Sequence, residues 1–271
     1  MKVVLMTGTH RRHFHLAQRL REWGVLEGLV VQDRGPEVPT LRGSSNSEVN
    51  NLFEQHFRGR RESERRFFGE VGEFRHLSDK YLYVEDDGDL NSAGTRQFLE
   101  EIAPDLLLTY NVGILRPEIV GSPGVKYAWN VHPGLTPRYK GAATHFWASY
   151  MLEPQMTGVT LHELTDCIDG GDVIHQCAAP LVAGDGIHDL SCRTLKRFFG
   201  ELELLLGNVA AKGNVEVERQ RSNGCVWRRS DWRPEHLSHI YVTWQNSIVD
   251  CYLAGSIRGN APTCFRGNWM E

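Results

Sequence analysis

Three side chains near the middle of the chain have the types and spacing of a catalytic group. Asn130 and His132 are two residues apart, and Asp169 lies in the later run Asp-Cys-Ile-Asp-Gly-Gly. On an extended segment, residues i and i+2 point to the same side, so the amide and the imidazole should face one cleft. An amide N–H can stabilise an oxyanion, and an imidazole beside a carboxylate can take up and pass on a proton. The set therefore predicts chemistry in which negative charge develops on an oxygen.

The neighbouring sequence predicts how this pair is presented. The apolar stretch 125–129 has the character of a buried strand, and the two prolines and two glycines within 133–141 should turn the chain away after it. We therefore expect Asn130 and His132 to be exposed at the carboxyl edge of a sheet, where open α/β folds bind ligands.

Each of the three residues also has a purely structural interpretation. Asn130 could cap the following turn, His132 could be a hydrogen-bonded structural histidine, and Asp169 before two glycines could be a turn residue. Their joint occurrence in this order weakens these alternatives.

The start of the chain predicts an α/β fold. An apolar strand at 3–6 is followed by an amphipathic helix at 12–23 and a second strand at 25–31, the βαβ order of a doubly wound, mostly parallel sheet. The turn Thr7-Gly8-Thr9 lacks the glycine pattern of a dinucleotide site. Further helices are expected at 91–103, 143–152 and 187–210, and further strands at 105–110, 158–162 and 172–176.

The motif residues also carry a family resemblance. The string Asn-Val-His-Pro-Gly-Leu-Thr-Pro-Arg-Tyr-Lys-Gly at 130–141, followed by Glu-Leu-Thr-Asp-Cys-Ile-Asp-Gly-Gly at 163–171, resembles the motif of the 10-formyltetrahydrofolate-dependent formyltransferases. That family includes glycinamide ribonucleotide transformylase, methionyl-tRNA formyltransferase and the sugar N-formyltransferases. The resemblance spans about 1–210, is strongest at 104–185 and implies a Rossmann-like catalytic domain over 1–210.

The resemblance implies a role for each motif residue. Asn130 would donate to the oxyanion of the tetrahedral intermediate, and His132 would supply a second, titratable donor. Asp169 would raise the pKa of the imidazole and relay the amine proton through water.

The resemblance also implies where 10-formyltetrahydrofolate, the co-substrate, would bind. The run Tyr110 to Pro117 matches the family segment that holds the pterin, and Gly113 would let the backbone approach its flat ring. The opposite wall would be the loop 165–168. The expected contacts are Val112, Gly113, Ile114, Leu115, Asp166 and Ile168.

Contacts with the amine acceptor are expected around the motif and near the N-terminus. Thr9, Arg11 or Arg12 would face an anionic part of the acceptor close to a helix N-terminus. His10 and His13 have helical spacing but no thiol or carboxylate beside them, so no metal is expected. The full expected set is Thr9, Arg11, Arg12, Tyr139, Lys140 and His145.

Two segments depart from the regular alternation. Residues 35–80 begin with a Pro-, Gly- and Ser-rich loop and continue as an amphipathic helix whose charged run 58–66 should face solvent. This insertion is either a lid over an edge of the sheet or a wall of the acceptor pocket. Residues 211–271 form a small extension expected to pack on the catalytic domain, with a helix over 234–254. Its Trp227, Arg228, Arg229 and Trp232 could stack on a base or sugar, or close the core.

Composition limits the class of protein. The chain has 271 residues, 41% hydrophobic, and a net charge of −4, which argues against a general electrostatic hold on nucleic acid. Six cysteines without C-x-x-C spacing are typical of reduced thiols, and we find neither a signal peptide nor an apolar run of about 20 residues. We expect a cytoplasmic enzyme without a membrane partner, and leave a homodimer open.

The predicted function is N-formylation of a small amine. Gly8-Thr9-His10 replaces the Gly-Ser-Asn type of phosphate loop of the purine-pathway transformylase, and residues 211–271 are few for the barrel of the methionyl-tRNA enzymes. A nucleotide-linked amino sugar is therefore the first acceptor, and a hydroxyornithine-type or antibiotic-pathway amine the second. The alternatives are a formyltetrahydrofolate hydrolase, disfavoured because the fold begins at Lys2, and a silent folate-binding module, disfavoured by the intact triad.

Overall fold

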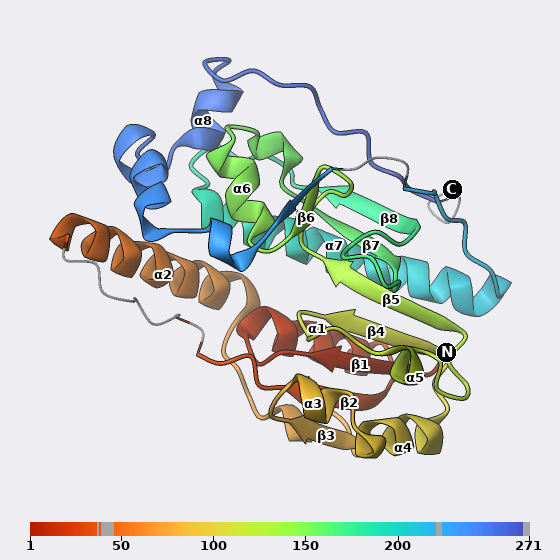
Figure 1. Ribbon diagram of the computed structural model, residues 1–271. Coiled ribbons are helices and arrows are strands. Elements are labelled where there is room, and N and C mark those ends of the chain that lie inside the picture. The colour runs from red at the N-terminus through yellow and green to blue at the C-terminus, as the bar shows by residue number, and fades with distance from the viewer. Residues whose placement is uncertain (37, 39–45, 221–223, 268–271) are drawn as a thin grey trace.

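A seven-stranded sheet organises the protein (Figure 1). The computed structural model describes residues 1–36, 38, 46–220 and 224–267. The strands are β1 Val3–Thr7, β2 Leu26–Gln32, β3 Tyr81–Val84, β4 Leu106–Tyr110, β5 Tyr127–His132, β6 Tyr139–Gly141, β7 Gly158–Glu163, β8 Val173–Ala178 and β9 Cys225–Trp227. The α-helices are α1 Arg11–Glu22, α2 Ser47–Phe68, α3 Asp87–Leu90, α4 Ala93–Ile102, α5 Pro117–Val120, α6 Thr144–Tyr150, α7 Ile187–Lys212 and α8 Ile248–Leu253.

The strand order of the main sheet is β3-β2-β1-β4-β5-β7-β8. The first five of these strands pair in parallel, whereas β7 runs antiparallel to both β5 and β8. The chain leaves β1 toward β2 on one side and returns to β4 on the other, which creates a crevice at the carboxyl ends of β1 and β4. The expected mostly parallel α/β sheet is confirmed.

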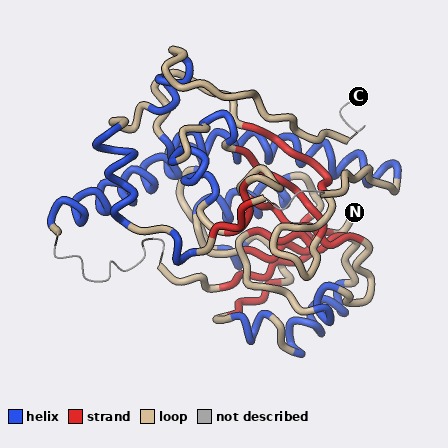
Figure 2. The backbone as a smooth tube through the Cα atoms, turned by 45° about the horizontal axis from the view of Figure 1, so that its top comes forward, coloured by secondary structure: helices blue, strands red, loops and turns tan. Residues whose placement is uncertain are grey.

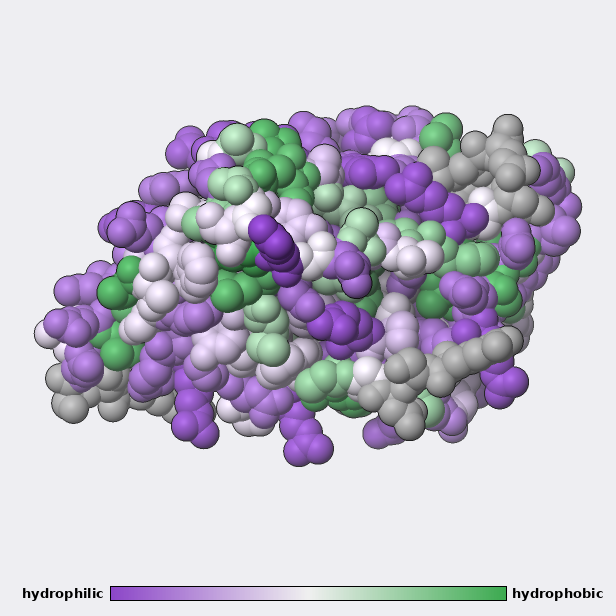
Figure 3. Space-filling model, turned by 90° about the horizontal axis from the view of Figure 1, so that it is seen from above, coloured by the Kyte–Doolittle hydropathy of each residue, from purple (hydrophilic) through white to green (hydrophobic). Residues whose placement is uncertain are grey.

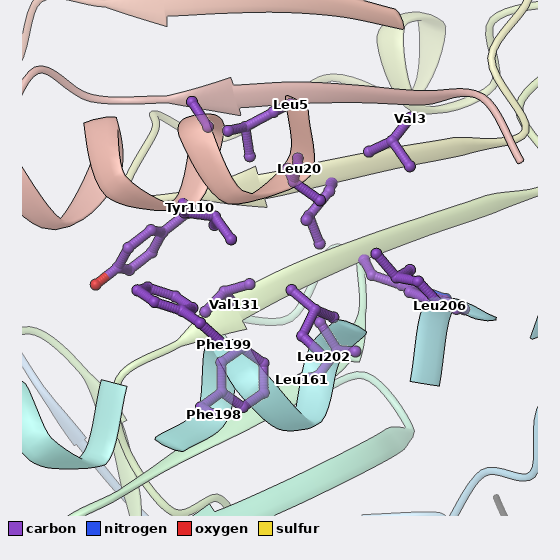
Figure 4. Packing of buried hydrophobic residues seen from close by; sticks show 14 of the residues in the cluster. Val3, Leu5, Leu20, Tyr110, Val131, Leu161, Phe198, Phe199, Leu202 and Leu206 are labelled. Atoms are coloured by element: carbon purple, nitrogen blue, oxygen red, sulfur yellow. The ribbon is translucent and has the colours of Figure 1, made fainter. Parts of the chain in front are cut away.

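Helices cover both faces of the sheet, as Figure 2 shows. The strands β1 and β4 are buried along their whole length, as expected of parallel strands enclosed between helices. One face packs against α1 and α7 (Figure 4), and the other against α4 and α5. The first of these contacts includes Val3, Leu5, Leu20, Tyr110, Val131, Leu161, Phe198, Phe199, Leu202 and Leu206.

The helix expected within 35–80 is α2, which begins where the Asn46 side chain accepts hydrogen bonds from the Glu48 and Val49 backbone N–H groups. It packs chiefly on α1 and α7. One expectation for this helix is wrong, because Glu64 in its charged run is buried and not solvated. Most of the loop expected before it lies outside the described residues.

The segment after α7 packs back against β6 and β8. The strand β9 pairs with β6, and Phe265 and Arg266 run beside β8. The single helix expected over 234–254 is wrong. Gln245 and Asn246 adopt positive φ and end a π-helical turn at 239–243, and α8 begins only afterwards. The division of the chain at residue 210 stays a prediction.

The surface seen in Figure 3 shows apolar residues in small groups among hydrophilic ones. Exposed large apolar side chains in the described parts of the chain include Met151, Val242 and Leu253. Scattered apolar residues of this kind are ordinary on a protein surface. Among the described helices, none combines the length and apolarity needed to cross a bilayer.

Candidate active site

The strand β5 carries the first two motif residues. Asn130 pairs across the sheet with His162 of β7, and His132 pairs with Thr160. The strand extends to His132 because β7 continues the ladder beyond residue 129. Consequently His132 is only 3% exposed, which corrects the expectation that both side chains stand free at the edge.

The Asn130 side chain is oriented by its neighbours on β4 and β7. The Thr109 hydroxyl lies 2.8 Å from Asn130 Oδ1, so the amide oxygen acts as the acceptor there. The amide nitrogen Nδ2 then faces His162 Nε2 at 3.1 Å and Asp169 Oδ1 at 3.4 Å. His162 Nδ1 donates to the Glu163 carbonyl at 2.7 Å, and His162 Nε2 also lies 3.3 Å from Asp169 Oδ1. Thr109 and His162 thus fix the direction of the amide.

Asp169 is held at the centre of the cluster by a turn with positive φ (47°). Its Oδ2 accepts from the Gly141 N–H at 2.7 Å and lies 3.3 Å from His132 Nδ1. Burial alone would raise the pKa of this carboxyl. His132, His162 and the Gly141 N–H more than offset it and lower the pKa to about 2. Asp169 is therefore ionised throughout the physiological range.

His132 has both ring nitrogens near protein groups. Nε2 donates to the Tyr139 carbonyl at 2.9 Å, which leaves Nδ1 toward Asp169. Burial lowers the pKa of His132, and the Asp169 carboxylate opposes that change. The neutral ring can take up a proton at Nδ1 and share it with Asp169, which suits a proton relay. The expected donation from His132 to an oxyanion requires its ring to change partners.

The C-terminal extension supports this cluster from outside. The Gln220 amide donates to the carbonyls of Asp169 at 3.1 Å and Gly171 at 2.6 Å, and so holds the turn that carries the carboxylate. Gly141 has φ +87°, and a Cβ there would collide with the Trp227 carbonyl of β9.

A cavity of about 1510 Å³ opens in front of the cluster. Asn130, His132 and Asp169 all line it. We call one side, formed by 112–115 and 165–168, the β4 end; every residue expected to contact folate lies in its wall: Val112, Gly113, Ile114, Leu115, Asp166 and Ile168.

The β4 end has an apolar surface without a protein partner. Ile114 is 78% exposed and Ile168 56%, an arrangement that suits a flat apolar ring between the two walls. The reason expected for Gly113 needs correction. A Cβ at this position would collide with the Asp87 carboxylate, and its N–H donates to Gln32 Oε1 at 2.8 Å. Glycine is therefore required at position 113 because a side chain would collide with Asp87, and not only because a ligand needs the space.

The other side of the cavity, which we call the α2 end, combines aromatic and basic side chains from distant segments. The helix α2 contributes Phe53, His56, Phe57 and Arg60, and the extension contributes Trp227, Arg228, Arg229, Trp232 and Pro234. The inserted helix therefore forms a wall of the cavity. That this wall belongs to an acceptor pocket stays a prediction. Trp227 also stacks on Trp147 of α6 at 4.2 Å, so it serves the core as well.

A buried ion cluster fastens α2 to α1 behind this wall. Glu64 Oε1 accepts from Arg12 at 2.8 Å and from Arg60 at 2.9 Å. Burial opposes ionisation of Glu64, but the two guanidinium groups lower its pKa to about 2. Both arginines line the cavity, whereas Glu64 lies behind them.

The residues expected to contact the acceptor divide into two groups. Arg12 and His145 line the cavity. Thr9, Arg11, Tyr139 and Lys140 are not part of its lining. Arg11 is paired with Glu70 at the surface, and the Tyr139 hydroxyl is bonded to Glu153, so these side chains are directed elsewhere.

No group of three or more His, Cys, Asp or Glu side chains is placed to hold a metal within the described ranges. His10 and His13 stack with ring centroids 5.1 Å apart. Burial, followed by Arg12 and Arg60, lowers the pKa of His10 to about 3. The neighbouring guanidinium groups would repel a cation here.

The sequence alone did not reveal Thr109, His162 or Gln220. His162 lies opposite Asn130 only because β5 and β7 pair antiparallel in this register. A polar residue at each strand end was the available signal for Thr109 and His162. Gln220 reaches the site from a segment without a strong pattern.

Comparison with known proteins agrees with this geometry. The family model described as Formyl transferase matches residues 1–198. A methionyl-tRNA formyltransferase of Anaplasma phagocytophilum (strain HZ) is 29% identical over 145 residues, covering 54% of this chain and 47% of its own length. A phosphoribosylglycinamide formyltransferase of Escherichia coli (strain K12) is 35% identical over 109 residues, covering 39% and 50% respectively. The chain thus spans about half the length of these curated relatives.

Solved structures share the fold at low sequence identity. A sugar N-formyltransferase from a Shewanella species has a TM-score of 0.55 and 15% identity, with 89% of this chain and 87% of that chain covered. A phosphoribosylglycinamide formyltransferase from Anaplasma phagocytophilum has a TM-score of 0.54 and 18% identity, with 84% and 98% covered. With the family match over residues 1–198, these findings show that the chain belongs to the formyl transferase family.

Proposed function

We propose that this protein transfers the formyl group of 10-formyltetrahydrofolate to the amine of a small acceptor. The observation that carries the proposal is the position of Asn130, His132 and Asp169 in one cavity, beside the exposed apolar walls of its β4 end. The cavity of about 1510 Å³ exceeds the usual size of a single small-ligand site, roughly 300–1,000 Å³. Two substrates fit this volume better than one.

The cluster can perform each part of this reaction. 10-Formyltetrahydrofolate supplies an activated formyl group, and attack by the amine forms the new C–N bond and places an electron pair on the carbonyl oxygen. Asn130 Nδ2 would stabilise that oxygen after releasing its present partners. His132 and Asp169 would take the proton of the attacking nitrogen and return it to the folate nitrogen as its bond to the formyl carbon breaks.

Among acceptors we place a nucleotide-linked amino sugar first. Aromatic and basic side chains of the α2 end are suited to a ring and a phosphate. A structurally similar N-formyltransferase from Helicobacter canadensis, with a TM-score of 0.52 and 16% identity, was solved with folinic acid and dTDP-3-aminofucose. A net charge of −4 favours a small acceptor over a nucleic acid.

The test follows the release of tetrahydrofolate by absorbance with a panel of amines. The panel contains dTDP-3-aminofucose, hydroxyornithine and glycinamide ribonucleotide, and each reaction is compared with one that lacks amine. Release that depends on one amine, with the formylated amine detected by mass spectrometry, supports the proposal and identifies the acceptor. Equal release without amine would indicate a hydrolase, and folate binding without release under any condition would contradict transfer.

A further inference from the structure

A second hydrogen-bonded pair lies on the cavity wall outside the catalytic cluster. His145 comes from α6 and Ser191 from α7, and both line the cavity. His145 Nδ1 is 2.6 Å from Ser191 Oγ, and His145 Nε2 is 2.7 Å from the Gly158 carbonyl oxygen. These three groups form a chain that runs from the backbone of β7 to the cavity.

The direction of every hydrogen bond in this chain follows from one carbonyl. A carbonyl oxygen can only accept, so His145 must carry its proton on Nε2. Burial is the chief reason that the pKa of His145 is lowered to about 4, and the ring is therefore neutral near pH 7. A neutral imidazole has a single N–H, so Nδ1 is an acceptor, and the Ser191 hydroxyl must donate to it.

With its proton donated to His145, the Ser191 hydroxyl can only accept further hydrogen bonds. A serine hydroxyl has one proton and two lone pairs, and the proton is committed to His145. Thr194, one turn later on the same helix, uses its hydroxyl in the ordinary way and donates to the Leu190 carbonyl at 2.8 Å. Ser191 instead turns toward His145 and stands in the wall of the cavity, where its lone pairs are available.

The pair also lies near the reacting groups. His132 is close enough to His145 to lower its pKa, and Thr144, the residue before it, is bonded to the Pro133 carbonyl just after the motif histidine. Ser191 lies on α7 close to His188, whose ring contacts that of His56 on α2. We therefore assign a substrate atom bound at Ser191 to the acceptor, which the proposed function places at the α2 end.

We propose that Ser191 Oγ accepts a hydrogen bond from an N–H or O–H group of the formyl acceptor, and that His145 is the positioning residue that sets its direction. The proposal rests on the proposed formyl transfer and adds a requirement on the substrate. An acceptor that presents a hydrogen-bond donor here is selected, and an analogue with an ether or another bare acceptor at that atom is rejected, because two lone pairs would face each other.

Steady-state kinetics with dTDP-3-aminofucose and saturating 10-formyltetrahydrofolate tests the role of Ser191. Ser191→Ala should raise the KM of the amino sugar about tenfold and change kcat less than about twofold, as expected for the loss of one hydrogen bond to a charged or polar group. Ser191→Thr keeps the hydroxyl and should restore the KM. Thr194→Val is the matched control, because it removes a hydroxyl from the same helix that bonds only within the helix. Folinic acid affinity should be the same in all variants.

The outcomes separate this inference from the proposed function. An active Ser191→Ala enzyme with KM within about twofold of the wild type overturns the inference and leaves formyl transfer intact. If another amine of the panel is the substrate, the same variants are compared with that amine. A wild-type protein that binds no folinic acid and formylates no amine overturns both.

The direction of the hydrogen bonds from Ser191 to the Gly158 carbonyl can also be measured without an enzyme assay. Nitrogen NMR of the histidines in the intact protein should show His145 neutral at pH 7 with its proton on Nε2. A proton on Nδ1, or a charged ring, would reverse the direction and overturn the assignment of Ser191 as an acceptor.

Discussion

The catalytic cluster and the α2 end of the cavity are built in different ways. At the catalytic cluster, each functional side chain comes from a sheet strand or an adjoining turn and is bonded to a neighbouring strand or backbone, as Asn130 is to Thr109 and His162. At the α2 end, the wall consists of side chains from an inserted helix and the C-terminal extension, packed ring against ring, such as Phe53 and Trp232. The catalytic cluster thus depends on strand register, whereas the α2 end depends on packing between an inserted helix and the C-terminal extension. Under the proposed function, this second region would select the acceptor.

Removing a catalytic group should give the largest effect. Asn130→Ala and Asp169→Asn should each lower kcat by about 10²–10³ while the folded structure persists, because each loses a preorganised donor or charge. Circular dichroism and steady-state rates measure the two properties. Asp172→Asn, a nearby carboxylate outside the cavity, is the control and should keep its rate. Near-normal turnover in both catalytic variants would contradict the site.

The attachment of α2 to α1 by Glu64 can be tested through the free energy of unfolding. Glu64→Ala leaves the Arg12 and Arg60 guanidinium groups without their shared carboxylate and should lower the free energy of unfolding by about 3 kcal/mol. Urea unfolding is the measurement. Glu62→Ala, an exposed carboxylate of the same helix, should change stability by less than about 0.5 kcal/mol. Equal effects of the two substitutions would show that the buried cluster does not fasten this wall.

Reciprocal substitutions at the two ends sharpen the contrast. Trp232→Ala removes an aromatic surface from the α2 end and should raise the KM of the acceptor about tenfold, with the KM of folate unchanged. Ile114→Asp at the β4 end should raise the KM of folate and leave the KM of the acceptor unchanged, because it places a charge on the exposed apolar wall. Two-substrate kinetics gives both constants. A shift of both KM values in either variant would mean that the ends are not separate sites.

The smallest expected effect is the pH dependence of stability that arises from buried histidines lining the cavity. Burial is the largest cause that lowers the pKa of His188 to about 3, and the same holds for His10 at about 3 and His145 at about 4. The unfolded chain binds these protons below about pH 6.5 and the folded protein does not. Stability should therefore fall as the pH decreases from about 6.5 toward 4.

One variant should show how much His188 contributes to the change of unfolding free energy with pH. His188→Asn should reduce the decline in unfolding free energy by about 1 kcal/mol per pH unit between about pH 6 and 5. Urea titrations at several pH values give the slope. A slope that is the same in the variant and the wild type would mean that His188 is already protonated in the folded protein.

The sequence predicted the part of the molecule whose geometry is local. The apolar runs and the helix at 187–210 specified the α/β sheet and its cover, and the spacing of Asn130 and His132 predicted that both face the same side of a strand. The resemblance to the formyltransferases, and not the spacing, brought Asp169 into the same group. Glu64 was misassigned because periodicity gives a helix face and not the charges that another helix brings to it.

Local sequence patterns could not predict the residues that long-range strand pairing and side-chain contacts bring together. His162 depends on the β5 and β7 register, and Gln220 depends on the path of the extension. The directions of Arg11 and Tyr139 depend on partners at Glu70 and Glu153, which no local pattern predicts.

The most direct test follows the formyl carbon itself. 10-Formyltetrahydrofolate labelled with ¹³C in the formyl group is mixed with the enzyme and the amine panel, and the label is followed by NMR. Formyl transfer predicts that the label moves into the amide of one amine, at a rate abolished in Asp169→Asn. Appearance of the label only as formate, or its retention on folate with every amine, would contradict the assignment of the cavity to formyl transfer.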